Sequence, residues 1–169
     1  MPTLLCTSKY RKTFGLPERL ETVEVDEGAL GPWYANTLNV GSQRFLHYMS
    51  GPSLLSVIVT LRDRHSAEQR FVQGLRELLN DLHVPESSIE REAEILGSLQ
   101  YGRASNRSVL GSLRDQGYLA DHRLHDDQFS LAEANRDLAE TPCGPMGYAS
   151  PKRVAPERLA ARWRWVTVH

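Results

Sequence analysis

Cysteine is scarce in this sequence, and no site built on thiols is expected. The 169 residues include two cysteines, Cys6 and Cys143, which lie far apart in the chain and form no Cys-x-x-Cys pair. Structural zinc sites are usually built from closely spaced thiolates and histidines. The sequence therefore predicts two free thiols, as is usual in the cytoplasm, and no thiolate zinc centre.

Long hydrophobic runs and a large charge of one sign are lacking too. No apolar stretch approaches the length of about 18 residues that suggests a membrane span, and residues 1–7 have no features of a secretory signal. We therefore expect a soluble, cytoplasmic protein without a membrane partner. The net charge of −1 argues against general nucleic-acid binding, but it hides an asymmetry, because the chain carries +4 from Cys143 onward and −5 before it.

Standard catalytic motifs are absent as well. The chain has no Walker or dinucleotide-binding glycine loop, no Gly-x-Ser-x-Gly motif and no His-Glu-x-x-His motif. The densest group of metal-binding residue types is at 121–127, where His122 and His125 are three residues apart. Because the end of a helix also favours positively charged histidine, this cluster has an ordinary explanation. We expect no bound metal and no cofactor.

The residues that are present predict one domain of the α+β class. Residues 33–40 and 44–49 read as two strands of a hairpin, which places Asn36 near His47. Residues 54–61 are nearly all apolar, as in a central strand covered on both faces. We expect an antiparallel sheet of about four to five strands, with helices packed mainly on one of its faces.

Two helices with capping boxes and apolar stripes are predicted at 66–82 and from Ser130 to just before Thr141. A third helix begins at Ser105 or Asn106 and turns Leu113 toward the core. Glycine inside a helix costs about 1 kcal/mol against alanine, so Gly111 and Gly117 suggest the close approach of another backbone or a ligand, or a helix that breaks near Gly117.

The polar face of this third helix is the candidate binding site. It is either a solvated surface or a site for an anion or a partner. Arginine, tyrosine and histidine gather there around the bare backbone of one glycine. The predicted binding residues are Asn106, Arg107, Ser108, Gly111, Arg114, Tyr118 and His122.

Residues 149–169 are predicted to form a basic, tryptophan-containing extension of a domain that spans residues 1–148. Residues 162–169 alternate as an edge strand would, with arginine and tryptophan interleaved. Two tryptophans in water would favour aggregation, so we expect Trp163 or Trp165 to be at least half buried. The alternative is a free arm that stacks on single-stranded nucleic acid.

Four segments, taken together and in this order, resemble an uncharacterised bacterial family that is classed only as a domain of unknown function. The resemblance covers roughly residues 1–148, and Asn-Arg-Ser-Val-Leu-Gly-Ser at 106–112 is its most specific part. It implies one α/β domain of bacterial or phage origin and no established activity, cofactor or substrate. The segments are residues 3–7, 33–36, 106–113 and 140–148, the last reading Glu-Thr-Pro-Cys-Gly-Pro-Met-Gly-Tyr.

Two functions fit these features. The first is a binding or interaction module for a protein or nucleic-acid partner, which would use the polar helix face and the basic tail. The alternative is a small hydrolase or nuclease that uses His, Arg and Asp, with His47 or His122 as the base and Arg107 on a phosphate. A buried histidine beside a carboxylate would favour the enzyme, and a flat exposed face would favour the module.

Overall fold

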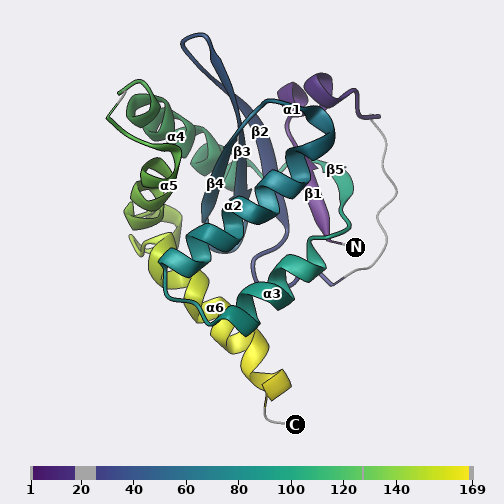
Figure 1. Ribbon diagram of the computed structural model, residues 1–169, viewed down its shortest axis with the longest axis vertical. Helices are drawn as coiled ribbons and strands as arrows, with labels where there is room; N and C mark the ends of the chain where they lie inside the picture. The colour runs from purple at the N-terminus through teal and green to yellow at the C-terminus, as the bar shows by residue number, and fades with distance from the viewer. Residues whose placement is uncertain (1, 18–25, 127, 168–169) are drawn as a thin grey trace.

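A mixed five-stranded sheet forms the centre of the protein (Figure 1). The computed structural model describes residues 2–17, 26–126 and 128–167. In space the strands follow the order β4-β3-β2-β1-β5. The predicted α+β class is confirmed. The strands are β1 (Thr3–Cys6), β2 (Trp33–Val40), β3 (Gln43–Ser50), β4 (Ser56–Thr60) and β5 (Gln100–Arg103).

The expectation of a purely antiparallel sheet is wrong, because β1 runs parallel to both of its neighbours, β2 and β5. The strands β2, β3 and β4 do form an antiparallel meander, and the predicted pairing of Asn36 with His47 is confirmed by the register. Short turns signal antiparallel neighbours in a sequence, whereas parallel neighbours are joined by long crossovers that leave no local signal. The parallel pairs were therefore not predicted.

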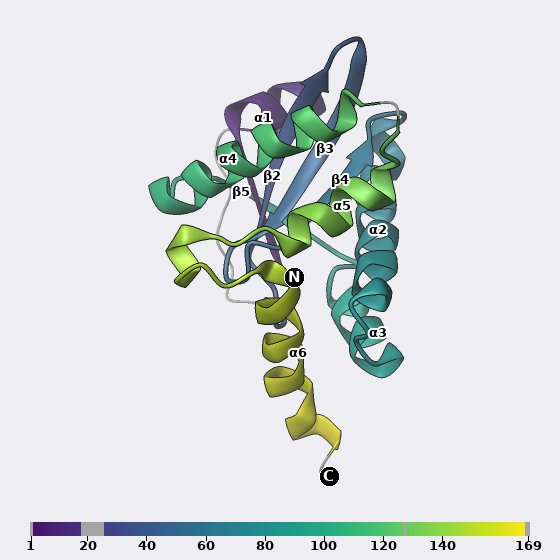
Figure 2. The same ribbon diagram turned by 90° about the vertical axis from the view of Figure 1, so that its left-hand side faces the viewer.

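Helices cover both faces of the sheet, rather than mainly one face as expected (Figure 2). Neighbouring residues of β3 point to opposite faces, so Tyr48 packs with one helical layer and Met49 with the other. None of the helices in the described part of the chain has the length and apolar character needed to cross a membrane. One layer contains α1 (Ser8–Phe14), α2 (Ala67–Asp81) and α3 (Glu86–Ile95), and the other contains α4 (Arg107–Leu124) and α5 (Leu131–Glu140).

The C-terminal segment is a helix, α6 (Pro151–Thr167), so residues 162–167 are helical and do not form the predicted strand. Ala155, Leu159 and Trp163 follow one another at intervals of four residues and join the apolar core that includes α2. Trp163 is only 9% exposed, so the expected burial of a tail tryptophan is confirmed. The side chain of Trp165 lies outside the described part of the chain, as do residues 168–169. The division of the chain at residue 148 stays a prediction.

A buried carboxylate attaches α6 to the rest of the protein. Glu92 of α3 accepts hydrogen bonds from the backbone N–H groups of Ala29 (3.0 and 3.1 Å) and Leu30 (2.9 Å). It also accepts one from the indole N–H of Trp163 (3.2 Å). Burial raises the pKa of Glu92, although these hydrogen bonds oppose the shift. Since its donors are themselves buried, Glu92 satisfies groups that would otherwise lack a partner.

Candidate partner-binding surface

Helix α4 begins at one of the two predicted positions. The side chain of Asn106 caps it by accepting a hydrogen bond from the backbone N–H of Val109 (3.1 Å). The helix then continues through Gly111 and Gly117 without a break. Leu113 is buried on its inner side, as predicted.

The predicted polar stripe lies on the outer side of α4. Arg107, Arg114, Tyr118 and His122 are all exposed. Their spacings of seven, four and four residues place them along one helix face over about 22 Å. Tyr118 is 67% exposed and the adjacent Leu119 is 41% exposed, which is unusual for large hydrophobic side chains. Ser108 is exposed in the first turn, close to the cap.

The two arginines of this stripe have no partner within the described residues. Neither Arg107 nor Arg114 forms a hydrogen bond or an ion pair there. The expectation that another backbone approaches Gly111 is wrong, because a Cβ atom added at this position would meet no atom of the described residues within 4 Å, and the approach of a ligand stays a prediction. Because Gly111 has no side chain, it leaves a shallow depression in the exposed stripe. The outer face of α4 is thus polar, partly aromatic and uncovered in the described structure.

The inner face of α4 carries a buried polar residue, Gln116, that the sequence analysis missed. Its side chain is 3% exposed. The side-chain oxygen of Gln116 accepts a hydrogen bond from the hydroxyl of Ser56, and its nitrogen donates to the carbonyl of Leu54 (2.9 Å). The same nitrogen lies 3.8 Å from the sulfur of Cys143. Its place between Leu113 and Ala120, at helical spacing, was the signal that could have identified Gln116 as an inward-facing residue.

His47 completes this buried polar group. Its Nε2 atom lies 2.7 Å from the Ser56 hydroxyl oxygen. Because the one hydroxyl hydrogen of Ser56 points to Gln116, the Nε2 atom of His47 must carry the hydrogen of this second bond. Burial lowers the pKa of His47 to about 4, and no neighbouring charge contributes. A buried histidine beside a carboxylate would have favoured an enzyme, and no carboxylate of the described residues contacts His47.

The second candidate base, His122, lies far from Arg107 along α4. The two residues are 15 positions apart on one helix, or about 22 Å, so they cannot act on the same phosphate. Nearby, the Nδ1 atom of His125 lies 2.7 Å from a carboxylate oxygen of Asp121, and a hydrogen bond to the Asp121 carbonyl is the main cause that raises the pKa of His125. No three potential metal ligands gather anywhere in the described structure, and Asp127 lies outside it.

A loop at residues 143–148 lies beside α4 (Figure 2). Cys143 and the partly buried Met146 pack in an apolar cluster that also contains Leu113 of α4. Backbone bonds from Cys143 to Ala149 (3.1 Å) and from Tyr148 to Cys143 (2.9 Å) close the loop on itself. Tyr148 has a φ of 64°, which is rare for a residue with a side chain, and is 77% exposed. The segments 106–113 and 140–148 therefore meet in space.

A domain of unknown function, DUF6933, matches residues 3–154. The chain belongs to this family. The DUF6933 match includes the whole of α4 and the loop at 143–148, and it ends within the first turns of α6. No curated protein and no solved structure matches the chain at a significant level.

Proposed function

We propose that the protein is an interaction module that binds a protein partner on the outer face of α4. The observation that supports this best is the exposure of Tyr118 one turn after Arg114, whose side chain has no partner among the described residues. Tyrosine and arginine are among the residue types that supply most of the binding energy in protein interfaces. Tyr148, on the loop that packs near Leu113 of α4, is a further exposed aromatic residue.

The inner face of α4 supports the same proposal. The bonds of Gln116 to Ser56 and Leu54 fix the helix on the sheet, so its outer side chains sit on a rigid element. A surface that is already ordered loses less conformational entropy when it binds. This arrangement favours a preformed docking face over one that folds during binding.

The charges of the face indicate the chemistry of its partner. In the part of the chain that the structure describes, the side chains of Arg107 and Arg114 are unpaired, and they lie at two points of the same stripe, on either side of Gly111. An acidic group that meets such an arginine in an interface contributes to specificity and to the rate of association. We expect a partner surface with carboxylates around an apolar centre that receives Tyr118.

The proposal is tested by photo-crosslinking in cells that produce the protein. A photoreactive phenylalanine derivative replaces Tyr118 in one variant and Glu77 in the other. Glu77 is exposed on α2, which covers the opposite face of the sheet, so it is a matched control. We expect a discrete crosslinked protein from position 118 that is absent from position 77. Identical products from both positions, or a crosslink only between copies of the chain, would contradict the proposal.

A further inference from the structure

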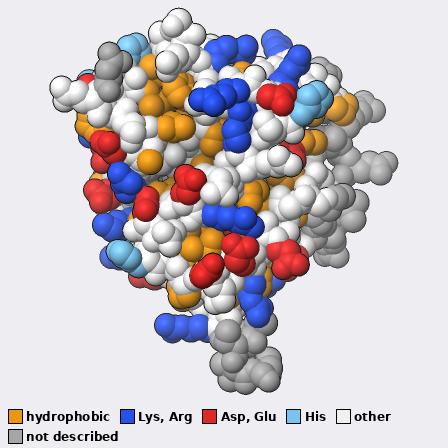
Figure 3. Space-filling view, viewed as in Figure 1, with side chains coloured by type: hydrophobic (Ala, Val, Ile, Leu, Met, Phe, Trp, Pro, Cys, Tyr) orange, Lys and Arg blue, Asp and Glu red, His pale blue; other side chains and the backbone are white. Residues whose placement is uncertain are grey.

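A basic hollow lies at one end of the sheet, apart from the α4 surface. Figure 3 shows Lys and Arg side chains gathered at the top of the molecule, above α1 and the beginning of α2. The hollow has a volume of about 580 Å³. Three segments form it, namely the end of α1, the start of β3 and the link from β4 to α2. Its lining residues are Thr13, Arg44, Leu61, Arg62, Asp63, Arg64 and His65.

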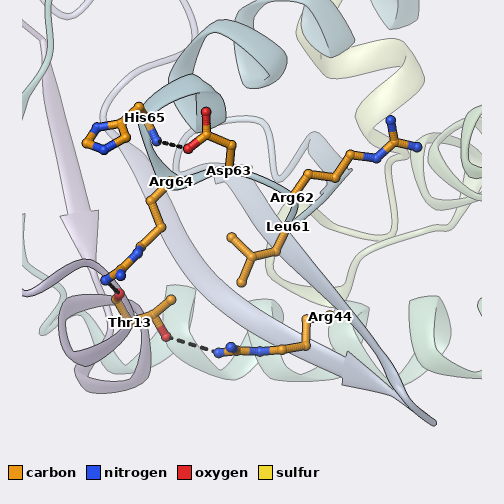
Figure 4. Close-up of a pocket in the computed structure, with 7 residues that line it drawn as sticks. All are labelled: Thr13, Arg44, Leu61, Arg62, Asp63, Arg64 and His65. Atoms are coloured by element: carbon orange, nitrogen blue, oxygen red, sulfur yellow. Dashed lines mark hydrogen bonds between the residues drawn. The ribbon is translucent and has the colours of Figure 1, made fainter.

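Two of the arginines converge on one residue of α1 (Figure 4). Arg64 donates a hydrogen bond to the carbonyl oxygen of Thr13 (2.9 Å), and Arg44 donates one to the Thr13 hydroxyl (3.5 Å). A guanidinium group has five N–H donors, and each of these bonds uses one of them. Most N–H donors of Arg44 and Arg64 therefore have no hydrogen-bond partner in the described structure. The side chain of Arg62 extends away from these two arginines (Figure 4).

The positive charge of the hollow is not neutralised within the described structure. None of its three arginines, Arg44, Arg62 and Arg64, is in an ion pair there. Asp63 lines the hollow but accepts a hydrogen bond from the backbone N–H of His65 (3.0 Å), and its carboxylate points away from Arg44 and Arg64 (Figure 4). Two guanidinium groups held at one residue repel each other, and an anion between them relieves this repulsion.

The backbone around the hollow is fixed before any ligand arrives. The N–H of Leu61 donates to the carbonyl of Arg44 (2.9 Å), and the side chain of Arg70 donates to the carbonyl of Asp63 (2.9 Å). From the lining the chain continues through a short 3-10 helix (Arg64–Ser66) into α2, which anchors this side of the hollow.

We propose that this hollow binds a phosphate group. Arginine binds the oxygens of a phosphate through paired, charge-assisted hydrogen bonds. Two arginines of the hollow are held at the same residue, Thr13. The lining contains no tryptophan, tyrosine or phenylalanine. Because arginines dominate the lining, we expect recognition to rest on the phosphate, either the terminal phosphate of a mononucleotide or a phosphodiester of a nucleic-acid strand.

The test is a titration of the full chain with inorganic pyrophosphate at constant ionic strength, followed through the arginine Nε–H signals in NMR spectra. We expect saturable shifts of the Arg44 and Arg64 signals. Arg44→Gln and Arg64→Gln should each weaken binding about ten-fold or more. Arg153→Gln, at an exposed arginine of α6, is the matched control and should leave the affinity unchanged. Shifts that do not saturate, or that chloride reproduces, would overturn the proposal.

Competition against pyrophosphate then separates the two sources of phosphate. Displacement by adenosine monophosphate but not by a ten-residue oligothymidylate assigns the hollow to terminal phosphates, and the opposite result assigns it to a nucleic-acid backbone. Displacement by neither compound would contradict the proposal. A thermal unfolding curve of each variant, matched to that of the unmodified chain, shows that lost binding does not reflect lost folding.

Discussion

The side chain of Gln116 accepts a hydrogen bond from the hydroxyl of Ser56, and this bond crosses the interface between α4 and β4. A second bond, from Gln116 to the carbonyl of Leu54, reaches a buried residue in a left-handed conformation with a φ of 57°. Both bonds are buried between the helix and the sheet. They determine how α4 is rotated about its own axis, and so which of its side chains face outward.

Replacement of Gln116 by alanine should destabilise the protein. The hydroxyl of Ser56 and the carbonyl of Leu54 would be left buried without their partner, which costs about 2–4 kcal/mol of unfolding free energy in total. Urea denaturation measures this loss. Arg114→Ala, on the outer face of the same helix, is the control and should change stability by no more than about 0.5 kcal/mol. Equal losses in the two variants would contradict the arrangement.

His47 should make stability depend on pH. Its pKa falls from 6.5 to about 4 on folding, so the unfolded chain binds a proton at a pH where the folded protein does not. The unfolding free energy is therefore highest, as far as His47 is concerned, above pH 6.5. It falls as the pH is lowered toward 4, by about 3 kcal/mol in total.

Denaturation of the unmodified chain and of His47→Gln at several pH values between 7 and 4.5 tests this dependence. The curve for His47→Gln should be flatter, because other titrating groups remain the same in both proteins. His122→Gln, at an exposed histidine, should reproduce the slope of the unmodified chain. Parallel curves for the unmodified chain and His47→Gln would show that His47 titrates normally in the folded protein.

Asn135 of α5 protects an edge of the sheet. Its side-chain oxygen accepts a hydrogen bond from the N–H of Ile58 (2.8 Å), and its nitrogen donates to the Ile58 carbonyl (3.1 Å). Because β4 is an edge strand, and not a central one as its apolar sequence predicted, this amide takes the place of a neighbouring strand. Asn135→Ala should cost about 2–3 kcal/mol of unfolding free energy in urea denaturation. The exposed Arg136→Ala should cost much less, and an equal cost would contradict this role.

Trp163 should stabilise the whole fold rather than α6 alone. Trp163→Ala removes a large buried side chain and should lower the unfolding free energy by about 3–5 kcal/mol. Trp163→Phe restores most of the apolar surface but not the N–H that binds Glu92, so its loss should be intermediate. Arg153→Ala is the exposed control on the same helix. Denaturation curves in which all three variants match the unmodified chain would show that α6 is not part of the core.

Local patterns in the sequence predicted the elements of the fold better than their arrangement. The stripe that includes Phe71 and Leu75 identified α2, and the Asn36–His47 pairing followed from the hairpin. The parallel pairing of β1 depends on contacts between distant segments, which no local pattern encodes. In the tail, the alternation of arginine and tryptophan obscured the four-residue spacing of Ala155, Leu159 and Trp163 that places them on one helix face.

The candidate site was predictable on its exposed side only. Periodicity was enough to place Arg107, Arg114 and Tyr118 on one face of α4. The buried side was missed, because Gln116 and Ser56 look like ordinary polar residues until the fold brings them together. The arginine hollow was missed for the same reason, since Arg44 and Arg64 are 20 positions apart in the sequence and come together only at Thr13.

The most direct test of the α4 surface uses the partner that the crosslinking experiment identifies. The measurement is the affinity of this partner, purified in its free form, for surface variants of the full chain. Tyr118→Ala should raise the Kd about ten-fold or more, as expected for an aromatic residue at the centre of an interface. Glu77→Ala, on the opposite face of the sheet, should leave the Kd unchanged. Equal Kd values for Tyr118→Ala, Glu77→Ala and the unmodified chain would contradict the assignment of this surface.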